Sequence, residues 1–324
     1  MKKAILFIVG ILLLPACGSI TAHASYKLST NTMKIITPFP AGGATDILAR
    51  YLAPFLSEKL GVTVIVENKP GASGAIASEL VANSPPDGSV LLLAATHHVI
   101  NPSLFRKLPY DTSKNFSPIA MVATSPNVLI VNNNVPVKSM ADLIALAKAK
   151  PGQLSFGSTG IGGANHLTGE LFKRAAGIDM VHIPYKGEAP SLNDLIGGHI
   201  PLMFGTLLTV LPSIEGGSVK ALAVGSLQRS PALPTVPTID EAGLKGFEAT
   251  SWFGLYMPAA NDNEAYRHIV SALKQILSSS EAREKFPYKG GTPGTLTGPD
   301  FKLFVDSEIT KWGNVIREAN VPQE

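Results

Sequence analysis

This sequence of 324 residues predicts an α/β protein built as two lobes, and three observations support the prediction. From about residue 30 onward, short apolar segments alternate with segments of helical periodicity, which is typical of parallel-rich sheets flanked by helices. Glycine-rich turns stand between an apolar segment and a helical one at two distant places, residues 38–46 and 157–163. The length is sufficient for two hydrophobic cores. Two such lobes would enclose a ligand between their glycine turns.

The N-terminus predicts an export signal. Lys2 and Lys3 precede an apolar run over residues 4–14, which is shorter than the about 20 residues needed to span a bilayer. The small residues Ala22 and Ala24 fit a cleavage site. We therefore interpret residues 1–24 as a signal peptide and expect an exported protein.

A second form of N-terminal processing stays open. The residues that end at Cys17 resemble a lipobox, and Cys17 would then carry a lipid anchor, although Pro15 is atypical of that motif. Cys17 is the single cysteine of the chain. The sequence therefore predicts neither a structural disulfide nor a thiolate metal site.

The first lobe is predicted from residues 25–125 together with residues 251–324. Helical spacing of apolar residues predicts a helix that contains Pro54 and ends at Gly61. The elements expected in this lobe are strands at 34–37, 62–67, 90–95 and 251–257, and helices at 44–60, 73–82, 263–278 and 299–319.

The second lobe is predicted from residues 126–250. Ser139 with Asp142, and Thr238 with Glu241, have the spacing of capping boxes at helix starts. The elements expected in this lobe are strands at 128–131, 154–156, 180–183, 201–204 and 220–224, and helices at 139–148 and 164–176. The chain would cross between the lobes near residues 125 and 250, which gives two hinge strands suited to rigid-body closure.

The first glycine turn has the chemistry of an anion site. Gly42 and Gly43 leave backbone N–H groups uncovered by side chains. A helix that begins behind them adds unpaired N–H groups and the positive end of its dipole. A carboxylate is the simplest ligand for such a turn. Asp46 has two interpretations, as part of this site or as an acid favoured by the helix dipole.

The sequence contains no catalytic, nucleotide-binding or metal-binding motif. Residues 71–74 lack the spacing of the G-x-S-x-G elbow, and residues 160–165 lack the third glycine of the dinucleotide fingerprint. His97 and His98 are adjacent, in or just after a predicted strand, so their side chains are expected on opposite faces, as loop or pocket wall. We therefore expect no cofactor and no metal.

The charge of the chain is nearly balanced. A formal charge of +3 comes from 27 basic and 24 acidic residues, and removal of Lys2 and Lys3 lowers it to +1. Phosphate-backbone binding depends on clustered Lys and Arg, and the sequence has no such cluster. A nucleic-acid partner is therefore not expected.

Together these motifs resemble the tripartite tricarboxylate transporter receptors, also called Bug proteins. The resemblance opens with residues 36–43, Asp46 and Arg50 and runs in order over essentially the whole mature chain. It continues through residues 67–74, 86–88, 158–160, 166–167, 184–187, 194–198, 229, 233–238, 241–243, 252–255 and 312.

The resemblance implies a two-lobed periplasmic binding protein of the type II, Venus-flytrap fold. Members of this family bind small organic acids between the lobes, largely through backbone amides and ordered water. They deliver the acid to a two-component membrane permease. The partners expected for this chain are therefore a small organic acid and, transiently, such a permease, and the chain itself is expected to be a monomer.

The expected ligand-binding residues come from the glycine turns and from neighbouring strand ends of both lobes. They are Phe39, Ala41, Gly42, Gly43, Thr45, Asp46, Thr96, Ser158, Thr159, Gly160, Asn165, Tyr185, Lys186 and Thr206. One departure from the family matters for the ligand. An acid and an amide often follow the phenylalanine at 204, whereas Gly205 and Thr206 follow it here. The identity of the acid therefore stays open.

Two other functions are alternatives to a transport receptor. A sensor that docks to a membrane kinase would use the same site, so the sequence does not separate it from a transport receptor. An enzyme on this fold would draw on Asp46, His166 and Lys186, but no nucleophile–base pairing is visible. We therefore expect a binding protein and not an enzyme.

Overall fold

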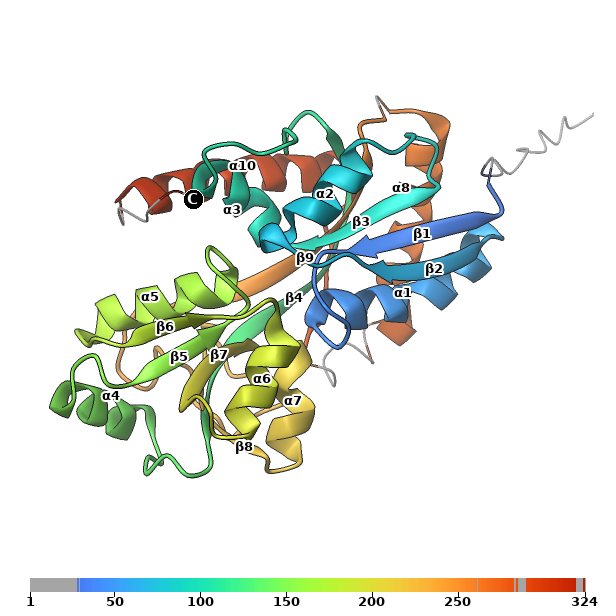
Figure 1. The fold of residues 1–324 in the computed structure, drawn as a ribbon. Helices are drawn as coiled ribbons and strands as arrows, with labels where there is room; N and C mark the ends of the chain where they lie inside the picture. The colour runs from blue at the N-terminus through green and yellow to red at the C-terminus, as the bar shows by residue number, and fades with distance from the viewer. Residues whose placement is uncertain are drawn as a thin grey trace, which may run out of the picture.

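A ten-stranded sheet runs through both halves of the molecule in this computed structural model (Figure 1). The structure describes residue 28, residues 30–260, 262–282, 284 and 290–318, and residue 323. The predicted signal peptide and Cys17 lie outside the described residues. Within the described part, no helix combines the length and the apolar character needed to cross a bilayer.

The sheet has a fixed strand order with parallel strands at its two ends. That order is β2 (Thr63–Asn68), β1 (Thr32–Thr37), β3 (Val90–Ala95), β9 (Thr250–Pro258), β4 (Phe116–Asn132), β7 (Leu202–Thr206), β5 (Ser155–Ser158) and β6 (Val181–Pro184). β8 (Val219–Val224) and β10 (Thr292–Pro293) also pair with β4. The parallel pairs are β1 with β2 and β3, and β5 with β6 and β7.

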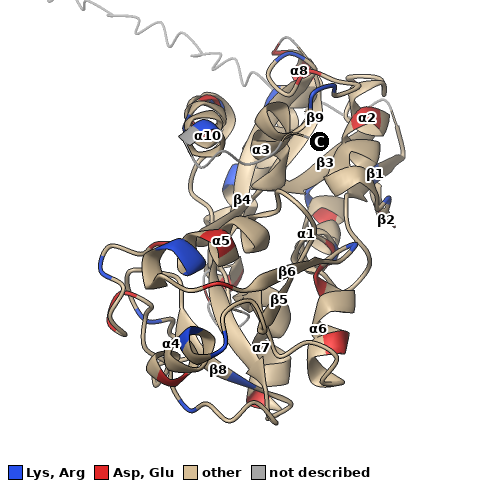
Figure 2. Ribbon diagram, turned by 60° about the vertical axis from the view of Figure 1, so that its left-hand side comes forward, with Lys and Arg blue, Asp and Glu red and all other residues tan. Residues whose placement is uncertain are grey.

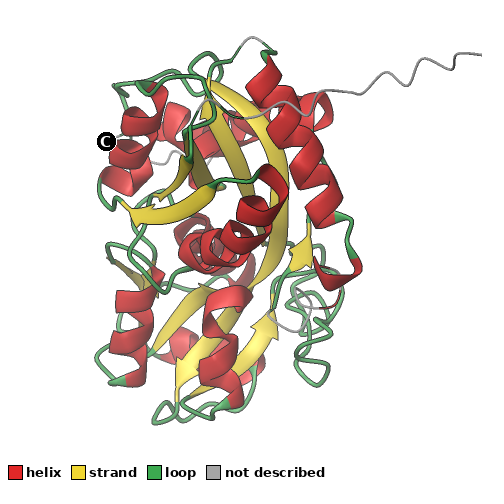
Figure 3. Ribbon diagram, turned by 90° about the vertical axis from the view of Figure 1, so that its right-hand side faces the viewer, coloured by secondary structure: helices red, strands yellow, loops and turns green. Residues whose placement is uncertain are grey.

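The centre of the sheet is antiparallel, which the strand–helix rhythm of the sequence did not reveal. β9 pairs antiparallel with β3 and with β4, and β4 pairs antiparallel with β7 and β8. β4 is long enough to pair with strands of both halves, and Figure 3 shows long strands running between them. Ser125 lies opposite Ser251 in this pairing. We therefore propose that the chain changes lobes near residues 125 and 250.

Helices cover both faces of each half (Figure 1). Those of the first lobe are α1 (Ala44–Leu60), the 3-10 turn η1 (Ala72–Gly74), α2 (Ala75–Ala82), α3 (His97–Leu104), α8 (Glu264–Leu277) and α10 (Gly298–Glu318). Those of the second lobe are α4 (Met140–Ala149), α5 (Ala164–Ala176), α6 (Glu188–Ile196) and α7 (Leu207–Glu215).

Side-chain alternation along the strands explains why each lobe has two hydrophobic clusters. In β1, Ile35 packs in the cluster that contains α1 and α8, whereas its neighbour Ile36 packs in the cluster that contains α2 and α10. In β7, Phe204 and Met203 divide in the same way between α5 and α7. Each sheet half is therefore buried on both faces, as expected for helix-covered strands.

Local signals placed several helices correctly. α1 ends at Gly61, which has a left-handed φ of 65° and donates its N–H to Ser57. Ser139 caps α4 by accepting the N–H of Asp142. Thr238 and Glu241 form both hydrogen bonds of a capping box, but the chain there makes turns and not a helix.

Three short helices were not predicted. α3, α6 and α7 each begin directly after a strand or a glycine turn, and each of them contains a proline. Of the two positions expected for His97 and His98, in a strand or just after one, the second is confirmed, because both lie in the first turn of α3, just after β3.

Candidate functional site

A cavity lies between the lobes, where β1 and β5 end and α1 and α5 begin. First-lobe residues, second-lobe residues and the strand β9 all contribute to its wall. The lining residues are Phe39, Gly43, Ala44, Thr45, Ala95, His97, Thr159, Gly163, Ala164, Asn165, Glu188, Thr206, Ser251 and Phe253. The carboxyl ends of parallel strands are where α/β sheets commonly bind ligands.

The lobes are in direct contact around this cavity. Ser73 of η1 donates its hydroxyl to the carbonyl of Ile161 across the lobes at 3.1 Å. The cavity is small in this arrangement of the lobes, with a volume of about 30 Å³.

The N-terminus of α1 faces the cavity without a side-chain cap. Its N-cap is Gly43, with φ −80° and ψ 167°, and no side chain bonds to the first turn. Among the described residues, the N–H groups of Ala44 and Thr45 have no hydrogen-bond partner. The Thr45 hydroxyl, in a residue 2% exposed, is also unpaired. This end of α1 therefore presents free donors and the positive end of the helix dipole to the cavity.

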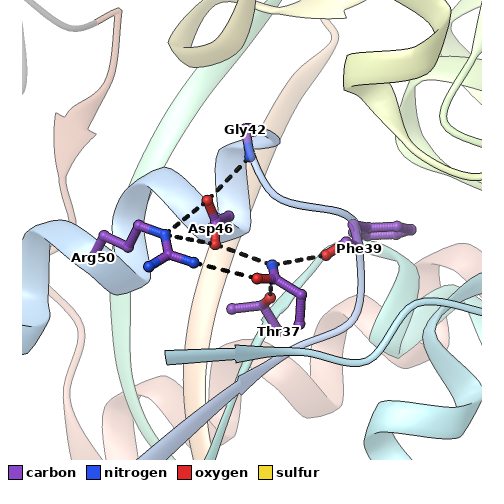
Figure 4. Close-up of polar contacts among 6 residues, drawn as sticks. Thr37, Phe39, Gly42, Asp46 and Arg50 are labelled. Carbon is purple, nitrogen blue, oxygen red and sulfur yellow. Dashed lines mark hydrogen bonds and ion pairs between the residues drawn. The ribbon is translucent and has the colours of Figure 1, made fainter. Parts of the chain in front are cut away.

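Gly42 and Asp46 are engaged with each other, which changes the expected role of this turn. The Gly42 N–H donates to Asp46 Oδ2 at 3.0 Å, so it is not free for a ligand (Figure 4). Asp46 also accepts from Arg50 Nε at 3.0 Å and from Asn68 Nδ2 at 3.0 Å. Ala41 and Gly42 are exposed and do not line the cavity. The N–H groups without a partner are therefore those of Ala44 and Thr45, the first two residues of α1.

The Asp46 carboxylate stabilises the turn in its ionised form. Burial raises the pKa of Asp46, but hydrogen bonds from Arg50, Gly42 and Asn68 outweigh it, so the pKa lies below its usual value. Asn68 Nδ2 also donates to the Phe39 carbonyl at 3.0 Å and to Thr37 Oγ1 at 2.7 Å. This network fixes the path of the chain from β1 into α1.

α5 presents a second uncapped N-terminus to the same cavity. Its N-cap is Gly163, with no side-chain hydrogen bond, and the N–H groups of Ala164 and Asn165 have no partner in the described part of the chain. The Asn165 side chain donates to the Phe204 carbonyl at 2.9 Å and accepts from Thr159 Oγ1 at 3.3 Å. These side-chain bonds hold the start of α5 beside the end of β7.

Ser158 supports the second glycine turn from behind. Its hydroxyl lies 2.6 Å from His182 Nε2, and it also donates to the Gly160 carbonyl and accepts the Gly160 N–H. The His182 ring stacks on His166 at 3.9 Å, and burial, together with His166, lowers the pKa of His182 to about 3. Ser158 is fully buried and does not line the cavity, so its hydroxyl serves the protein itself.

Tyr185, Lys186 and Gly160 border a different opening between the lobes. This second cavity has a volume of about 210 Å³ and is lined by Phe39, Gly71, Ala72, Ser73, Gly74, Thr159, Gly160, Ile161, Pro184, Tyr185 and Lys186. The Tyr185 hydroxyl donates to Asp194 Oδ2 at 2.7 Å, and burial with this neighbour raises the pKa of Tyr185 to about 12. Phe39 and Thr159 line both cavities and separate them.

Thr96 also has its hydroxyl engaged inside the protein. It accepts the Trp252 N–H at 3.2 Å and donates to the Trp252 carbonyl at 3.4 Å, which ties the end of β3 to β9. The Thr96 hydroxyl is thus hydrogen-bonded within the protein, and Thr96 does not line this cavity. Of the expected site residues, those that line the first cavity are Phe39, Gly43, Thr45, Thr159, Asn165 and Thr206.

The sequence interpretation missed eight residues of the cavity wall as ligand contacts. They are Ala44, Ala95, His97, Gly163, Ala164, Glu188, Ser251 and Phe253. His97 was expected in a loop or in a pocket wall, and in the structure it lies in the wall of this cavity. Its two ring nitrogens are buried and unpaired, and burial lowers its pKa to about 3. Glu188 directly follows Gly187 in the sequence. A helix predicted to start at this position would have placed Glu188 beside the cavity.

The described residues contain no group of three or more His, Cys, Asp or Glu side chains that could hold a metal ion. The cavity wall also includes no Lys or Arg. Figure 2 shows acidic and basic residues interspersed over both halves of the ribbon. The chemistry of the cavity is therefore that of helix N-termini, hydroxyls and two titratable side chains, His97 and Glu188.

Comparison with known proteins gives one consistent result. The model of the tripartite tricarboxylate transporter family receptor matches residues 48–321. R. palustris Rpa4515 with adipate is 35% identical, with a TM-score of 0.88 over 91% of this chain and 99% of that one. The periplasmic binding protein BugD is 34% identical, with a TM-score of 0.86 over 90% and 99%. MatC (Rpa3494) from Rhodopseudomonas palustris with bound malate is 28% identical, with a TM-score of 0.82 over 88% and 98%.

Proposed function

This chain belongs to the tripartite tricarboxylate transporter receptor family, and from that premise we propose that it captures a small organic carboxylate between its lobes. Residues between the lobes would hold this carboxylate, and the protein would deliver it to a two-component permease. The two-lobed periplasmic binding-protein fold and the receptor family are the established frame for it.

The main support for this proposal is that a helix N-terminus from each lobe lines the same cavity. Ala44 and Thr45 at the start of α1 lie on one side, and Ala164 and Asn165 at the start of α5 lie on the other. Unpaired N–H groups at a helix start favour negative charge. Two such ends facing one space suit a carboxylate that bridges the lobes and stabilises their closed arrangement.

Unpaired buried polar atoms around the cavity add support. The Thr45 hydroxyl and both ring nitrogens of His97 lack partners, although buried polar groups in proteins are nearly always hydrogen-bonded. A ligand or ordered water in the cavity would satisfy them. Because burial keeps His97 neutral, it would act as a donor and an acceptor without bringing a charge.

The similar solved structures support the ligand class. Rpa4515 is described with adipate and MatC with malate, and both align with this chain over most of its length. Each hydrogen bond to a charged carboxylate contributes roughly 1.5–3 kcal/mol, so a few of them, less the cost of closure, would give about −8 kcal/mol and micromolar affinity.

The site residues that we propose for the ligand are the N–H groups of Ala44, Thr45, Ala164 and Asn165, with the side chains of Thr45 and His97. Phe39 and Thr159 form the wall toward the second opening, where Tyr185 and Lys186 stand. We also propose export through residues 1–24, a monomeric state and a transient complex with the permease.

A thermal-shift screen of mono-, di- and tricarboxylates, including adipate and malate, tests this function. A ligand at 100 times its dissociation constant stabilises the native state by about 2.7 kcal/mol, which raises the melting temperature measurably. Calorimetry of the best acid should then give one site per chain.

Gly43→Val is the variant that links binding to the helix start. Gly43 has an ordinary φ, and a Cβ there meets only the Pro40 carbonyl at 3.5 Å, so the fold should tolerate it. The larger side chain would cover the free amides, and we expect at least a tenfold loss of affinity. Unchanged affinity in a variant with a normal melting temperature would place the anion elsewhere.

A further inference from the structure

Glu188 is a buried acid in the wall of the ligand cavity, and the expected ligand site did not include it. It is the first residue of α6, directly after Gly187, and it is 4% exposed. Its Oε1 accepts the backbone N–H of Thr206 at the end of β7. A Cβ built on Gly205 would lie 3.4 Å from the same oxygen, so the carboxyl group lies beside the strand where Gly205 has no side chain.

Among the described residues, no charged group packed against Glu188 compensates its charge. The strands packed against α6, which are β4, β5 and β7, contain no charged residue, and Glu215 lies at the far end of α7. Across the cavity His97 is neutral, and in α1 Asp46 is paired with Arg50. On its own helix Asp194 is bonded to Tyr185, and Lys186 lies exposed in the turn before the helix.

Burial therefore dominates the titration of this acid. It raises the pKa of Glu188 to about 7, although the hydrogen bond from the Thr206 N–H acts in the opposite direction. The neutral and ionised forms are both accessible near neutral pH, before any ligand is present.

An anionic ligand changes this balance in one direction. A carboxylate held by the starts of α1 and α5 would share this small cavity with Glu188, and no Lys or Arg lines it. Two carboxylates in such a space cannot both stay ionised without a large cost. A protonated Glu188 removes the repulsion and supplies an O–H donor. Because Oε1 already accepts the Thr206 N–H, the proton belongs on Oε2.

We propose that Glu188 is a specificity-determining residue that holds the ligand in its protonated form, donating from Oε2 to a ligand carboxylate, so that each anion binds together with one proton from solvent. This inference rests on the proposed function, since it requires a carboxylate in this cavity. The receptor would then favour acids whose carboxylate accepts this hydrogen bond, and it would bind them more tightly as the pH falls.

The test is calorimetric titration of the full mature protein with adipate and malate between about pH 6.5 and about pH 9. Carboxyl pKa values near those of Asp and Glu keep both acids ionised over this range, so a pH dependence arises from the protein. We expect the dissociation constant to rise up to tenfold per pH unit above about 7. Titrations in buffers of different ionisation enthalpy should show uptake of up to one proton per ligand, largest at the alkaline end.

Glu188→Gln isolates the proton, because the amide donates a hydrogen bond but does not titrate. We expect it to bind at the low-pH affinity of the wild type, with no pH slope and no proton uptake from this position. Glu215→Gln, an exposed acid in the same lobe, should keep the wild-type slope. Apo melting temperatures confirm that each variant is folded.

The outcomes separate the two proposals. Binding without a pH slope or proton uptake in the wild type, or a slope that persists in Glu188→Gln, overturns the role of Glu188 and leaves the carboxylate receptor intact. Affinity that rises with pH would show that ionised Glu188 accepts a ligand donor, and this also overturns the inference. A folded wild type that binds no acid of the panel at any of these pH values overturns the proposed function itself.

Discussion

At the scale of single residues, polar groups around the lobes divide into those with protein partners and those without. The side chains of Asp46, Ser158 and Thr96 form hydrogen bonds within the protein. Thr45 and His97 line the cavity with buried atoms that have no partner. Because unpaired buried polar atoms are costly, the second group marks the place where a ligand or water completes the structure.

Asp46 offers a test of its structural role. Asp46→Ala removes the acceptor of the Gly42 and Asn68 donors and leaves Arg50 without its partner. We expect it to lower the free energy of unfolding by about 2–4 kcal/mol at pH 7, measured with urea. Asp46→Asn keeps the size of the side chain and one acceptor oxygen, so it should lower the free energy of unfolding by less.

The pH dependence of this effect has a defined sign. The pKa of Asp46 is lowered in the folded state, so its ionised form stabilises the fold above the unfolded pKa of about 3.9. This contribution is lost as the pH falls through the lower, folded pKa. The gap between wild type and Asp46→Asn should therefore narrow in acid. A gap that stays constant down to about pH 2 would show that the charge does not contribute.

At the scale of elements, the helices differ in how they begin. α4 and α8 have side-chain caps, Ser139 and Asn263, whose oxygens accept N–H groups of the first turn. α1 and α5 begin at glycines without such a bond, and so do α2 and α6. Capping contributes about 1 kcal/mol, so an uncapped helix start is a stability loss. Because the starts of α1 and α5 line the cavity, we interpret Gly43 and Gly163 as keeping the N–H groups of these two helices available to a ligand.

Gly43→Ser tests this trade between stability and binding. Serine at an N-cap position accepts the N–H of the second or third helical residue, and the φ and ψ of Gly43 already suit a cap. We expect the apo protein to gain a few tenths of a kcal/mol in thermal denaturation and the affinity for the acid to fall several-fold. Ser139→Gly on α4 is the matched control and should lower stability without changing affinity. A serine variant that binds better would contradict this role of the helix start.

At the scale of the whole molecule, ligand capture depends on contacts that form only when the lobes meet. Gly162 of the second lobe lies against Leu104 of the first, and a Cβ on Gly162 would stand 1.9 Å from Leu104 Cδ2. A Cβ built on Gly42 would lie 3.8 Å from Ala189 Cβ, which is an ordinary contact. The missing side chain of Gly162 therefore permits this close approach of the lobes.

Gly162→Ala should therefore hinder closure. We expect about a tenfold weaker affinity for the acid by calorimetry, because the bound state requires the closed lobes. Gly162 has a φ of +70°, which adds backbone strain, so Gly177→Ala is the matched control, with φ +60° and no neighbour within 4 Å of its Cβ. Leu104→Ala in the same chain should restore part of the affinity. An equal loss in the Gly177 variant would assign the effect to strain alone.

Much of the architecture and part of the site were predictable from the sequence because the signals are local. Helical periodicity located α1, α5, α8 and α10, and Gly61 marked the end of α1. The glycine turns located the starts of α1 and α5, which now line the cavity. α3 and α7 escaped prediction because each is short and contains a proline, so packing stabilises them more than their own propensity does.

By itself the sequence determined the two glycine turns, the family resemblance and the expectation of an anion site. The tertiary structure alone decided which donors remain free, since Asp46 takes the Gly42 N–H and His182 lies beside the Ser158 hydroxyl. It also decided that His97 and Glu188 line one cavity from opposite lobes. The physical reason is that periodicity and turn chemistry act over a few residues, whereas hydrogen-bond partners and burial depend on residues far apart in the chain.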